Sequence, residues 1–263
     1  MILDEIAADT RLRVEEAKKN VSLEEIMKRA LGMDAKTGFP VEQELKREGI
    51  HFICEVKKAS PSKGLIAKEF PYLTIAKEYE EAGASVISCL TEPTYFQGSD
   101  QYLKEIAGEV SIPVLRKDFT IDPYQIYEAK VLGAAMVLLI CALLDTDTLK
   151  EYIEICDKLG LSALVETHDE TEMQSALKAG ARIIGVNNRN LKDFTVDIHN
   201  STKLRALAPP EVIFVAESGI KTAEDIQVLR DAKVNAVLIG ETLMRSNNKK
   251  QMLDSLSRVP NAL

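Results

Sequence analysis

Two charged residues stand inside an apolar stretch near position 55, at a spacing that suits a shared chemical task. The stretch reads "FICEVK" at residues 52–57, and its apolar residues are typical of a buried strand. Glu55 and Lys57 are two positions apart, so in a strand their side chains point to the same face. Burying a charge is costly unless the charge is paired or used. A carboxylate beside an ammonium group is suited to binding a polar substrate and to transferring protons.

Residues of the same kind recur at the ends of five further apolar runs: Lys117, Glu166, Asn187 with Arg189, Glu217 with Ser218, and Gly240 with Glu241. Each one alone is also typical of a solvated strand end, and Glu55 with Lys57 alone would also suit a structural ion pair. Six runs in agreement favour a single polar site. Neighbouring charges and partial burial in such a site shift pKa values, as acid–base chemistry at neutral pH requires.

These runs belong to a repeating unit that must position them. Apolar segments alternate with helical segments, and several helices end in a glycine exit such as "EAGAS" at 81–85, which suits a left-handed residue after a helix. In the last exit, "DAKVNA", we expect Asn235 to take that conformation. The expected strands are residues 52–57, 85–90, 113–118, 134–140, 162–167, 183–188, 212–218 and 236–241.

Strict alternation of strand and helix implies an α/β fold with a parallel sheet and right-handed crossovers. Eight such units favour a closed (β/α)8 TIM barrel, whose functional residues lie at the carboxyl ends of the strands. An open doubly wound sheet is the alternative. It is weaker because neither G-x-G-x-x-G nor G-x-x-x-x-G-K-[ST] follows the first strand.

The first 48 residues have a helical, amphipathic pattern. Leu12 and Val14 are among the residues expected to face inward on the first helix, and Ser22 with Glu25 matches a capping box before the second. We therefore expect a single domain over 1–263, made of a helical N-terminal extension at 1–48 and a (β/α)8 barrel at 49–263.

Composition excludes several classes of function. The net charge of −8 and the pI near 5.2 argue against binding to nucleic acid or to an anionic membrane. The four cysteines lack C-x-x-C spacing, and His51, His168 and His199 are scattered, so we expect reduced core thiols and no metal. The start of the chain is charged, unlike a signal peptide, and the apolar run at 134–144 is too short to span a bilayer. We expect a soluble, cytoplasmic protein.

Two glycines suggest a phosphate site. Gly219 in "ESGIKTAED" follows the seventh apolar run, and Gly240 in "GETLM" follows the eighth. Barrels often bind phosphate through backbone N–H groups of the loops after these two strands. A simple turn would also use a glycine at either place, but the two together favour phosphate.

With these residues placed, the chain resembles the indole-3-glycerol phosphate synthase family over nearly its whole length. The resemblance is carried, in this order, by "EVKKASPSKG" (55–64), "LTEPTYFQGS" (90–99), "VLRKDF" (114–119), "LVETHDE" (164–170), "GVNNRNL" (185–191), "VAESGI" (215–220) and "IGETLM" (239–244). It implies a carboxy-lyase of tryptophan biosynthesis without metal or organic cofactor. That enzyme converts 1-(2-carboxyphenylamino)-1-deoxyribulose 5-phosphate to indole-3-glycerol phosphate, releasing carbon dioxide and water.

The resemblance also implies roles for particular residues. Lys117 corresponds to the general acid and Glu166 to the general base. Glu55 and Lys57 correspond to a pair that orients the site and contacts the substrate, with Lys57 as an alternative acid. Polar residues that hold substrate hydroxyls or support the site complete the catalytic set: Asn187, Ser218 and Glu217.

A second group of residues is implied in substrate binding. Ser60 and Arg189 match positions near the anionic or ring parts of the substrate, and Phe96 and Phe119 match the apolar pocket for its ring. The remaining members of that pocket also suit ordinary core packing: Leu138, Leu191 and Ile239. Phosphate binding falls to Gly219, Gly240 and Glu241. We expect only the backbone N–H of Glu241 to contribute, because a carboxylate repels phosphate.

The same residues would also suit other functions. A different phosphosugar barrel, such as a phosphoribosylanthranilate isomerase or a class I aldolase, would use similar residues, and an aldolase would use Lys117 or Lys57 as a Schiff-base nucleophile. A phosphate-binding scaffold without activity is a further alternative. The expected partner is a small phosphorylated, anthranilate-derived molecule. The expected state is a monomer, with a weak homodimer as the alternative, and "KKASPSKGLIAKEF" is a plausible lid.

Overall fold

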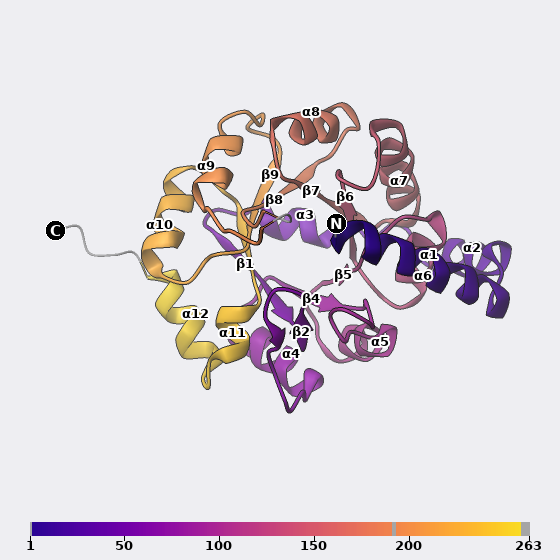
Figure 1. Cartoon of the computed structure of the whole chain (residues 1–263), viewed down its shortest axis with the longest axis horizontal. Helices are drawn as coiled ribbons and strands as arrows, with labels where there is room; N and C mark the ends of the chain where they lie inside the picture. Colours follow the sequence, from indigo (N-terminus) through magenta and orange to yellow (C-terminus); the bar gives the residue numbers. More distant parts are fainter. Residues whose placement is uncertain (1, 191–192, 259–263) are drawn as a thin grey trace.

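Eight parallel strands close into a barrel in the computed structural model, which describes residues 2–190 and 193–258 (Figure 1). The strand order is β1-β10-β9-β8-β7-β6-β5-β4, and β1 pairs with both β10 and β4, which closes the sheet. The (β/α)8 prediction is therefore confirmed, and the open sheet is excluded. Each expected strand matches an observed one within two residues at either end: β1 (His51–Val56), β4 (Val86–Leu90), β5 (Val114–Lys117), β6 (Met136–Ile140), β7 (Ser162–Thr167), β8 (Ile183–Asn187), β9 (Ile213–Glu217) and β10 (Ala236–Ile239).

Helices cover the outside of the barrel and alternate with the strands (Figure 1). Several begin at a side-chain cap that the sequence supplies, such as Asp122, Asp145 and Asp169, whose carboxylates accept a backbone N–H of the first turn. The helices of the barrel are α4 (Tyr72–Glu81), α5 (Asp100–Glu109), α6 (Pro123–Val131), α7 (Thr146–Leu159), α8 (Glu170–Lys178), α9 (His199–Arg205), α10 (Ala223–Asp231), α11 (Glu241–Arg245) and α12 (Lys249–Ser257).

Helix exits follow the expected glycine pattern with one exception. Gly83, Gly133 and Gly180 have positive φ values after α4, α6 and α8. After α10 the left-handed residue is Lys233, with φ of 61°, so the expectation for Asn235 was wrong. The Asn235 side chain instead accepts a hydrogen bond from the backbone N–H of Phe214 at 2.9 Å.

Two layers of apolar side chains hold the barrel. The layer outside the strands packs against the helices, and a smaller cluster fills the barrel interior. Val41 and Leu45 of the short helix α3 (Pro40–Leu45) are fully buried and belong to the interior cluster, together with Ile53, Leu115 and Leu164. Because functional residues of such a barrel lie at the carboxyl ends of its strands, this packed interior serves as the floor of the site.

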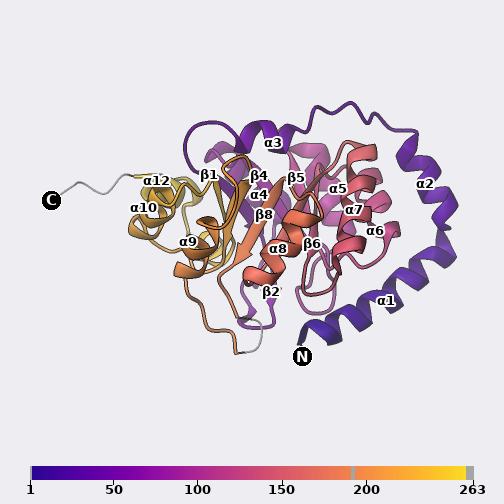
Figure 2. The ribbon, with the colours of Figure 1, turned by 90° about the horizontal axis from the view of Figure 1, so that it is seen from above.

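Helices α1 (Ile2–Asn20) and α2 (Leu23–Leu31) run beside α6 (Figure 2). The Arg13 guanidinium donates to both carboxylate oxygens of Asp118, at 2.9 and 2.6 Å, and this ties α1 to the residue after β5. None of the helices in the described ranges is long and apolar enough to cross a membrane.

Two details of the extension differ from expectation. Leu12 is 72% exposed, whereas Val14 is buried. Ser22 caps α2 by accepting the backbone N–H of Glu25, but the Glu25 carboxylate pairs with Arg29 at 2.7 Å, so the α2 cap is formed by Ser22 alone.

Candidate active site

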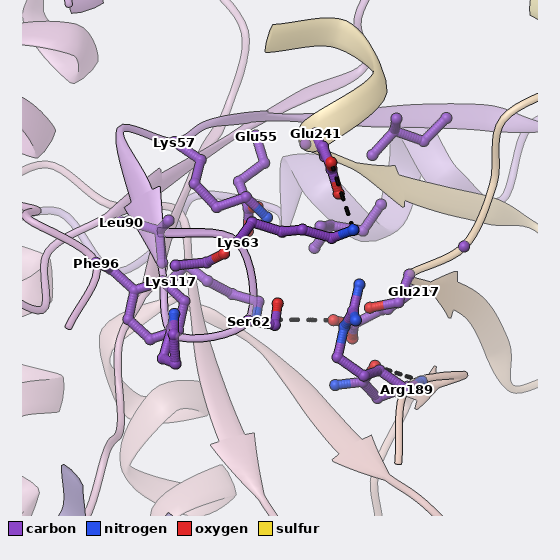
Figure 3. Close-up of a pocket in the computed structure, with 18 of the residues that line it drawn as sticks. Glu55, Lys57, Ser62, Lys63, Leu90, Phe96, Lys117, Arg189, Glu217 and Glu241 are labelled. Carbon is purple, nitrogen blue, oxygen red and sulfur yellow. Dashed lines mark hydrogen bonds and ion pairs between the residues drawn. The ribbon is translucent and has the colours of Figure 1, made fainter. Parts of the chain in front are cut away.

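A cavity of about 720 Å³ opens at the carboxyl ends of the strands (Figure 3). The structure brings all fourteen residues chosen from the sequence to its wall: Glu55, Lys57, Ser60, Phe96, Lys117, Phe119, Glu166, Asn187, Arg189, Glu217, Ser218, Gly219, Gly240 and Glu241.

Lys117 lies at the centre of the charged wall, at the end of β5. Its Nζ is 3.7 Å from Oε2 of Glu166 on β7 and 3.8 Å from Oε2 of Glu217 on β9. Burial lowers the pKa of the ammonium group, but Glu166, Glu217 and Glu55 outweigh burial and raise it above its ordinary value. Lys117 therefore carries its proton at neutral pH and points a positive charge into the cavity.

Glu55 and Lys57 form the second ion pair, with Oε2 and Nζ 2.5 Å apart at the end of β1. Burial raises the pKa of Glu55, yet Lys57 and Lys117 together hold it below its ordinary value. A Cβ on Gly240 would lie 2.4 Å from Oε2 of Glu55 and 2.9 Å from Nζ of Lys57. The glycine after β10 is therefore required for space, because any side chain there would displace this pair.

The two carboxylates beside Lys117 have opposite protonation states at neutral pH. For Glu166, burial raises the pKa, but Lys117 and His168 outweigh burial and lower it to about 2. For Glu217, burial and the neighbouring Glu166 charge raise the pKa to about 8. Paired carboxyl groups whose pKa values are pushed apart are typical of acid–base sites.

The surroundings of Glu217 fit a protonated acid. Its Oε1 is buried and has no hydrogen-bond partner within the described residues. That oxygen faces Gly185 of β8, where an added Cβ would lie only 2.3 Å away. The glycine therefore makes room for this oxygen, which receives no hydrogen bond from a described residue.

Amide and backbone groups complete the wall between β8 and β9. Asn187 donates from Nδ2 to Oε1 of Glu166 at 3.3 Å, and its Oδ1 accepts the backbone N–H of Arg189 at 3.1 Å. Ser218 has a φ of 67°, which is uncommon for a residue with a side chain, and Gly219 follows with a φ of 86°. Strained backbone of this kind is concentrated at functional sites, where it presents backbone groups to a ligand.

One end of the cavity is basic. Its loop carries the hairpin β2 (Ala59–Ser60) and β3 (Gly64–Leu65), whose turn holds Lys63. Lys63 Nζ lies 3.8 Å from Oε1 of Glu241 (Figure 3), and the same oxygen accepts from Nε of Arg245 at 3.1 Å. The Glu241 carboxylate is thus held by two cations, with Lys221 also on the cavity wall. These three basic residues were not predicted from the sequence, although the lysines in "SPSKG" and "ESGIK" were an available signal for two of them.

The other end is apolar. The rings of Phe96 and Phe119 lie with centroids 5.9 Å apart at 40°, and Leu138 and Ile239 also line the cavity. Leu191, expected in this pocket, lies outside the described residues. The N-terminal helix also contributes to the site, which was not predicted from the sequence. Its first turns add three apolar side chains to the wall: Ile2, Leu3 and Ile6.

Fold and site together define a TIM-barrel enzyme with buried acid–base groups at the mouth of the barrel. The chain matches the family model described as indole-3-glycerol phosphate synthase over residues 3–256. The chain belongs to the indole-3-glycerol phosphate synthase family.

Individual relatives agree with this placement. An indole-3-glycerol phosphate synthase of Ruminiclostridium cellulolyticum is 64% identical over 248 residues, which cover 94% of this chain and 95% of that protein. One of Endomicrobium trichonymphae is 57% identical, covering 97% and 99% of the two chains.

More distant solved structures share the fold alone. KGPDC from Streptococcus mutans has a TM-score of 0.62 at 12% identity, covering 79% of this chain and 95% of that chain. A 3-hexulose-6-phosphate synthase has a TM-score of 0.62 at 14% identity, covering 79% and 98% of the two chains.

Proposed function

We propose that this chain closes the indole ring: it converts 1-(2-carboxyphenylamino)-1-deoxyribulose 5-phosphate to indole-3-glycerol phosphate, with release of carbon dioxide and water. Family membership over residues 3–256 supports the reaction. The observation that carries the chemistry is Lys117, held charged between an ionised and a protonated carboxyl group inside the cavity.

The two ends of the cavity suit the two ends of this substrate. The phosphate binds at the basic end, among the backbone N–H groups after β9 and β10 and the side chains of Lys63 and Arg245. The aromatic ring binds against Phe96 and Phe119, where apolar surface is removed from water. The ketone then lies between these ends, beside the charged wall.

Ring closure begins when the ring carbon that carries the carboxylate attacks the ketone carbon. The ketone oxygen gains negative charge as the new bond forms, and the Lys117 ammonium protonates it. The ionised carboxylates of Glu166 and Glu55 keep Lys117 charged until an alkoxide, a stronger base than they are, develops beside it. Loss of carbon dioxide returns the electron pair to the ring.

Dehydration needs both a base and an acid. Glu166 removes a proton from the carbon attached to nitrogen, because it is ionised and Asn187 and Lys117 orient it. The hydroxyl at the neighbouring carbon takes a proton from the Lys57 ammonium group, or from Lys117 after Lys117 has regained a proton from solvent, and leaves as water. Ser218 and Asn187 hold the substrate hydroxyls, and the paired Glu55 fixes Lys57 in place.

A single assay tests the reaction and the acid together. Purified protein is mixed with the deoxyribulose phosphate substrate in the presence of a chelator, and indole fluorescence is followed. We expect the signal to rise, and Lys117→Met to lower kcat by about 10² to 10⁴-fold. Lys130→Met is the matched control, because Lys130 is also buried but bonds only to the backbone oxygen of Asp34 in the described structure, far from the cavity wall. A folded protein without activity would refute the proposal.

Schiff-base chemistry is tested separately. Borohydride is added during turnover and the protein mass is measured. We expect the mass to stay unchanged, since Lys117 and Lys57 act as acids rather than nucleophiles. A covalent adduct at either lysine would refute the proposed mechanism.

We also propose that the chain acts as a monomer in the cytoplasm. All fourteen residues with a predicted role in catalysis or substrate binding reach one cavity within a single chain, which supports the monomer as the active unit. Cys54, Cys89 and Cys156 are buried and unpaired, which fits a reducing compartment. Light scattering at micromolar concentration tests the state, and a dimer mass would refute it.

A further inference from the structure

One titratable side chain beside the site has no place in the roles proposed above. His168 follows directly after β7, two residues beyond Glu166, and its Nε2 lies 3.4 Å from Oε1 of Glu166. This Nε2 is buried and makes no hydrogen bond to any described residue. A buried polar atom without a hydrogen bond is costly, so its placement against a catalytic carboxylate calls for a reason.

Glu172 of α8 holds the histidine from the other side. Its Oε2 accepts the backbone N–H of His168 at 2.8 Å and lies 3.0 Å from the imidazole Nδ1. The backbone oxygen of His168 accepts from Nδ2 of Asn200 at 3.0 Å. The ring is therefore anchored through its own Nδ1 and through the backbone at both ends, and Nε2 is left facing Glu166.

Both carboxylates favour the charged ring. Burial lowers the pKa of His168, but Glu166 and Glu172 outweigh burial and raise it to about 10. An imidazolium has a proton on each ring nitrogen, so it can serve Glu172 and Glu166 at once. The charged groups around the ring are Glu166 on β7, Asp169 and Glu172 at the start of α8, and, beyond Glu166, Lys117 on β5 and Glu217 on β9.

We propose that His168 is a positioning residue for the base: anchored by Glu172 as an imidazolium, it keeps the Glu166 carboxylate ionised and turned toward Lys117 and the cavity. This inference rests on the proposed role of Glu166 as the base. It gives the base a cation that stays in place during the reaction, whereas Lys117 loses its proton to the substrate.

The Lys117 ammonium and the His168 imidazolium act on Glu166 at different stages of the reaction. While Lys117 is charged, Glu166 is flanked by two positive groups and cannot take the Lys117 proton, which would neutralise the acid and the base together. Once that proton has passed to the ketone oxygen, one cation is gone and Glu166 becomes more basic. It then accepts the proton from the substrate carbon, and passing that proton to Lys117 restores both groups.

The kinetic test compares His168→Gln, which removes the charge, with His168→Lys, which restores a cation. The readout is the pH profile of kcat/KM. We expect His168→Gln to raise the pH of the acidic limb by roughly 1 unit or more, because Glu166 loses a cation, and His168→Lys to recover part of the shift. At pH 7 Glu166 stays ionised in both proteins, so an expected loss of about tenfold in kcat there reports the lost orientation of its carboxylate. A His168→Gln profile that superimposes on that of the parent would overturn the inference.

The protonation state is tested without turnover. The chain has three histidines, so His168 can be assigned in imidazole NMR spectra by comparison with His168→Gln. We expect its ring to remain protonated at pH 8 and to lose that property in Glu172→Gln. Titration of the parent ring near 6.5, the ordinary value, would overturn the inference.

Glu166→Gln separates this inference from the proposed function. If Glu166→Gln retains activity, the proposed base is wrong. If Glu166→Gln is inactive but His168→Gln behaves like the parent, the base stands and only the role of His168 is wrong.

Discussion

Glu217 should destabilise the folded protein at neutral pH, although it lies at the heart of the site. Its pKa is about 8 in the fold and 4.5 for an ordinary glutamate. A group whose pKa is raised by folding stabilises fully below 4.5, and its contribution is lost as pH rises toward 8. At about 1.4 kcal/mol per pH unit, the loss between pH 5 and pH 8 is at most about 3–4 kcal/mol, and relaxation of Lys117 toward the anion reduces it to about 2–3 kcal/mol.

Glu217→Gln removes this pH dependence because an amide of the same shape does not ionise. We expect the melting temperature of the variant, relative to that of the parent, to rise by about 5–10 °C between pH 5 and pH 8. Comparing the two pH values cancels any constant change in packing. Glu211→Gln, which alters an exposed carboxylate, is the matched control and should show no such trend.

The opposite trend would refute the reasoning about Glu217. If Glu217→Gln loses stability relative to the parent as pH rises, Glu217 is an anion paired with Lys117. The separation of the two carboxyl pKa values beside Lys117 would then be wrong, and only Glu166 and Lys117 would retain their proposed states.

Two further predictions concern space and anchoring. Gly240→Ala should displace the ion pair at the end of β1 and lower kcat about 100-fold, because misplacing catalytic groups by about 1 Å reduces rates to that extent. The control is Gly108→Ala on α5, where an added methyl group meets no other atom, so kcat should be unchanged and stability should rise slightly. Equal kcat values for the two variants in steady-state assays would refute the steric argument. Arg13→Met leaves the fully buried Asp118 carboxylate without its bidentate partner, so it should lower the free energy of unfolding by about 2–4 kcal/mol. Urea denaturation measures this change. An unchanged midpoint of urea unfolding would show that this ion pair does not anchor α1.

Most of the barrel could be predicted because each unit repeats the same local signals. A short apolar run followed by a helix occurs eight times, often with a side-chain cap or a left-handed exit, and a closed parallel sheet is the arrangement that buries all of the runs. Charged residues at the ends of the runs then identified one end of the barrel as the site. All of these signals are local, so the sequence displays them directly.

The errors arose where residue type was given more weight than position. Asn235 was chosen because asparagine tolerates a left-handed conformation, but Lys233 stands two residues after the end of α10, as Gly83 does after α4. Leu12 and Val14 are two residues apart, which places them on nearly opposite sides of a helix, so both could not face inward.

The parts of the site that the sequence did not reveal depend on contacts between distant segments. His168 looked like an isolated histidine, because its carboxylate partners become significant only when β7 and α8 fold together. The apolar residues at the start of α1 looked like ordinary packing residues, because their position at the cavity depends on how the extension docks against the barrel.

The pairing of β1 with β10 has a consequence for the chain during its synthesis on the ribosome. Strand β1 contributes Glu55 and Lys57, and its neighbour β10, which leads to Gly240, is among the last elements to be synthesised. A nascent chain that contains β1 to β9 has most of the acid and base groups. It lacks β10 and Gly240, which lie beside the Glu55–Lys57 pair in the folded barrel. We therefore expect a growing chain to be inactive until β10 has emerged and paired with β1, which closes the barrel.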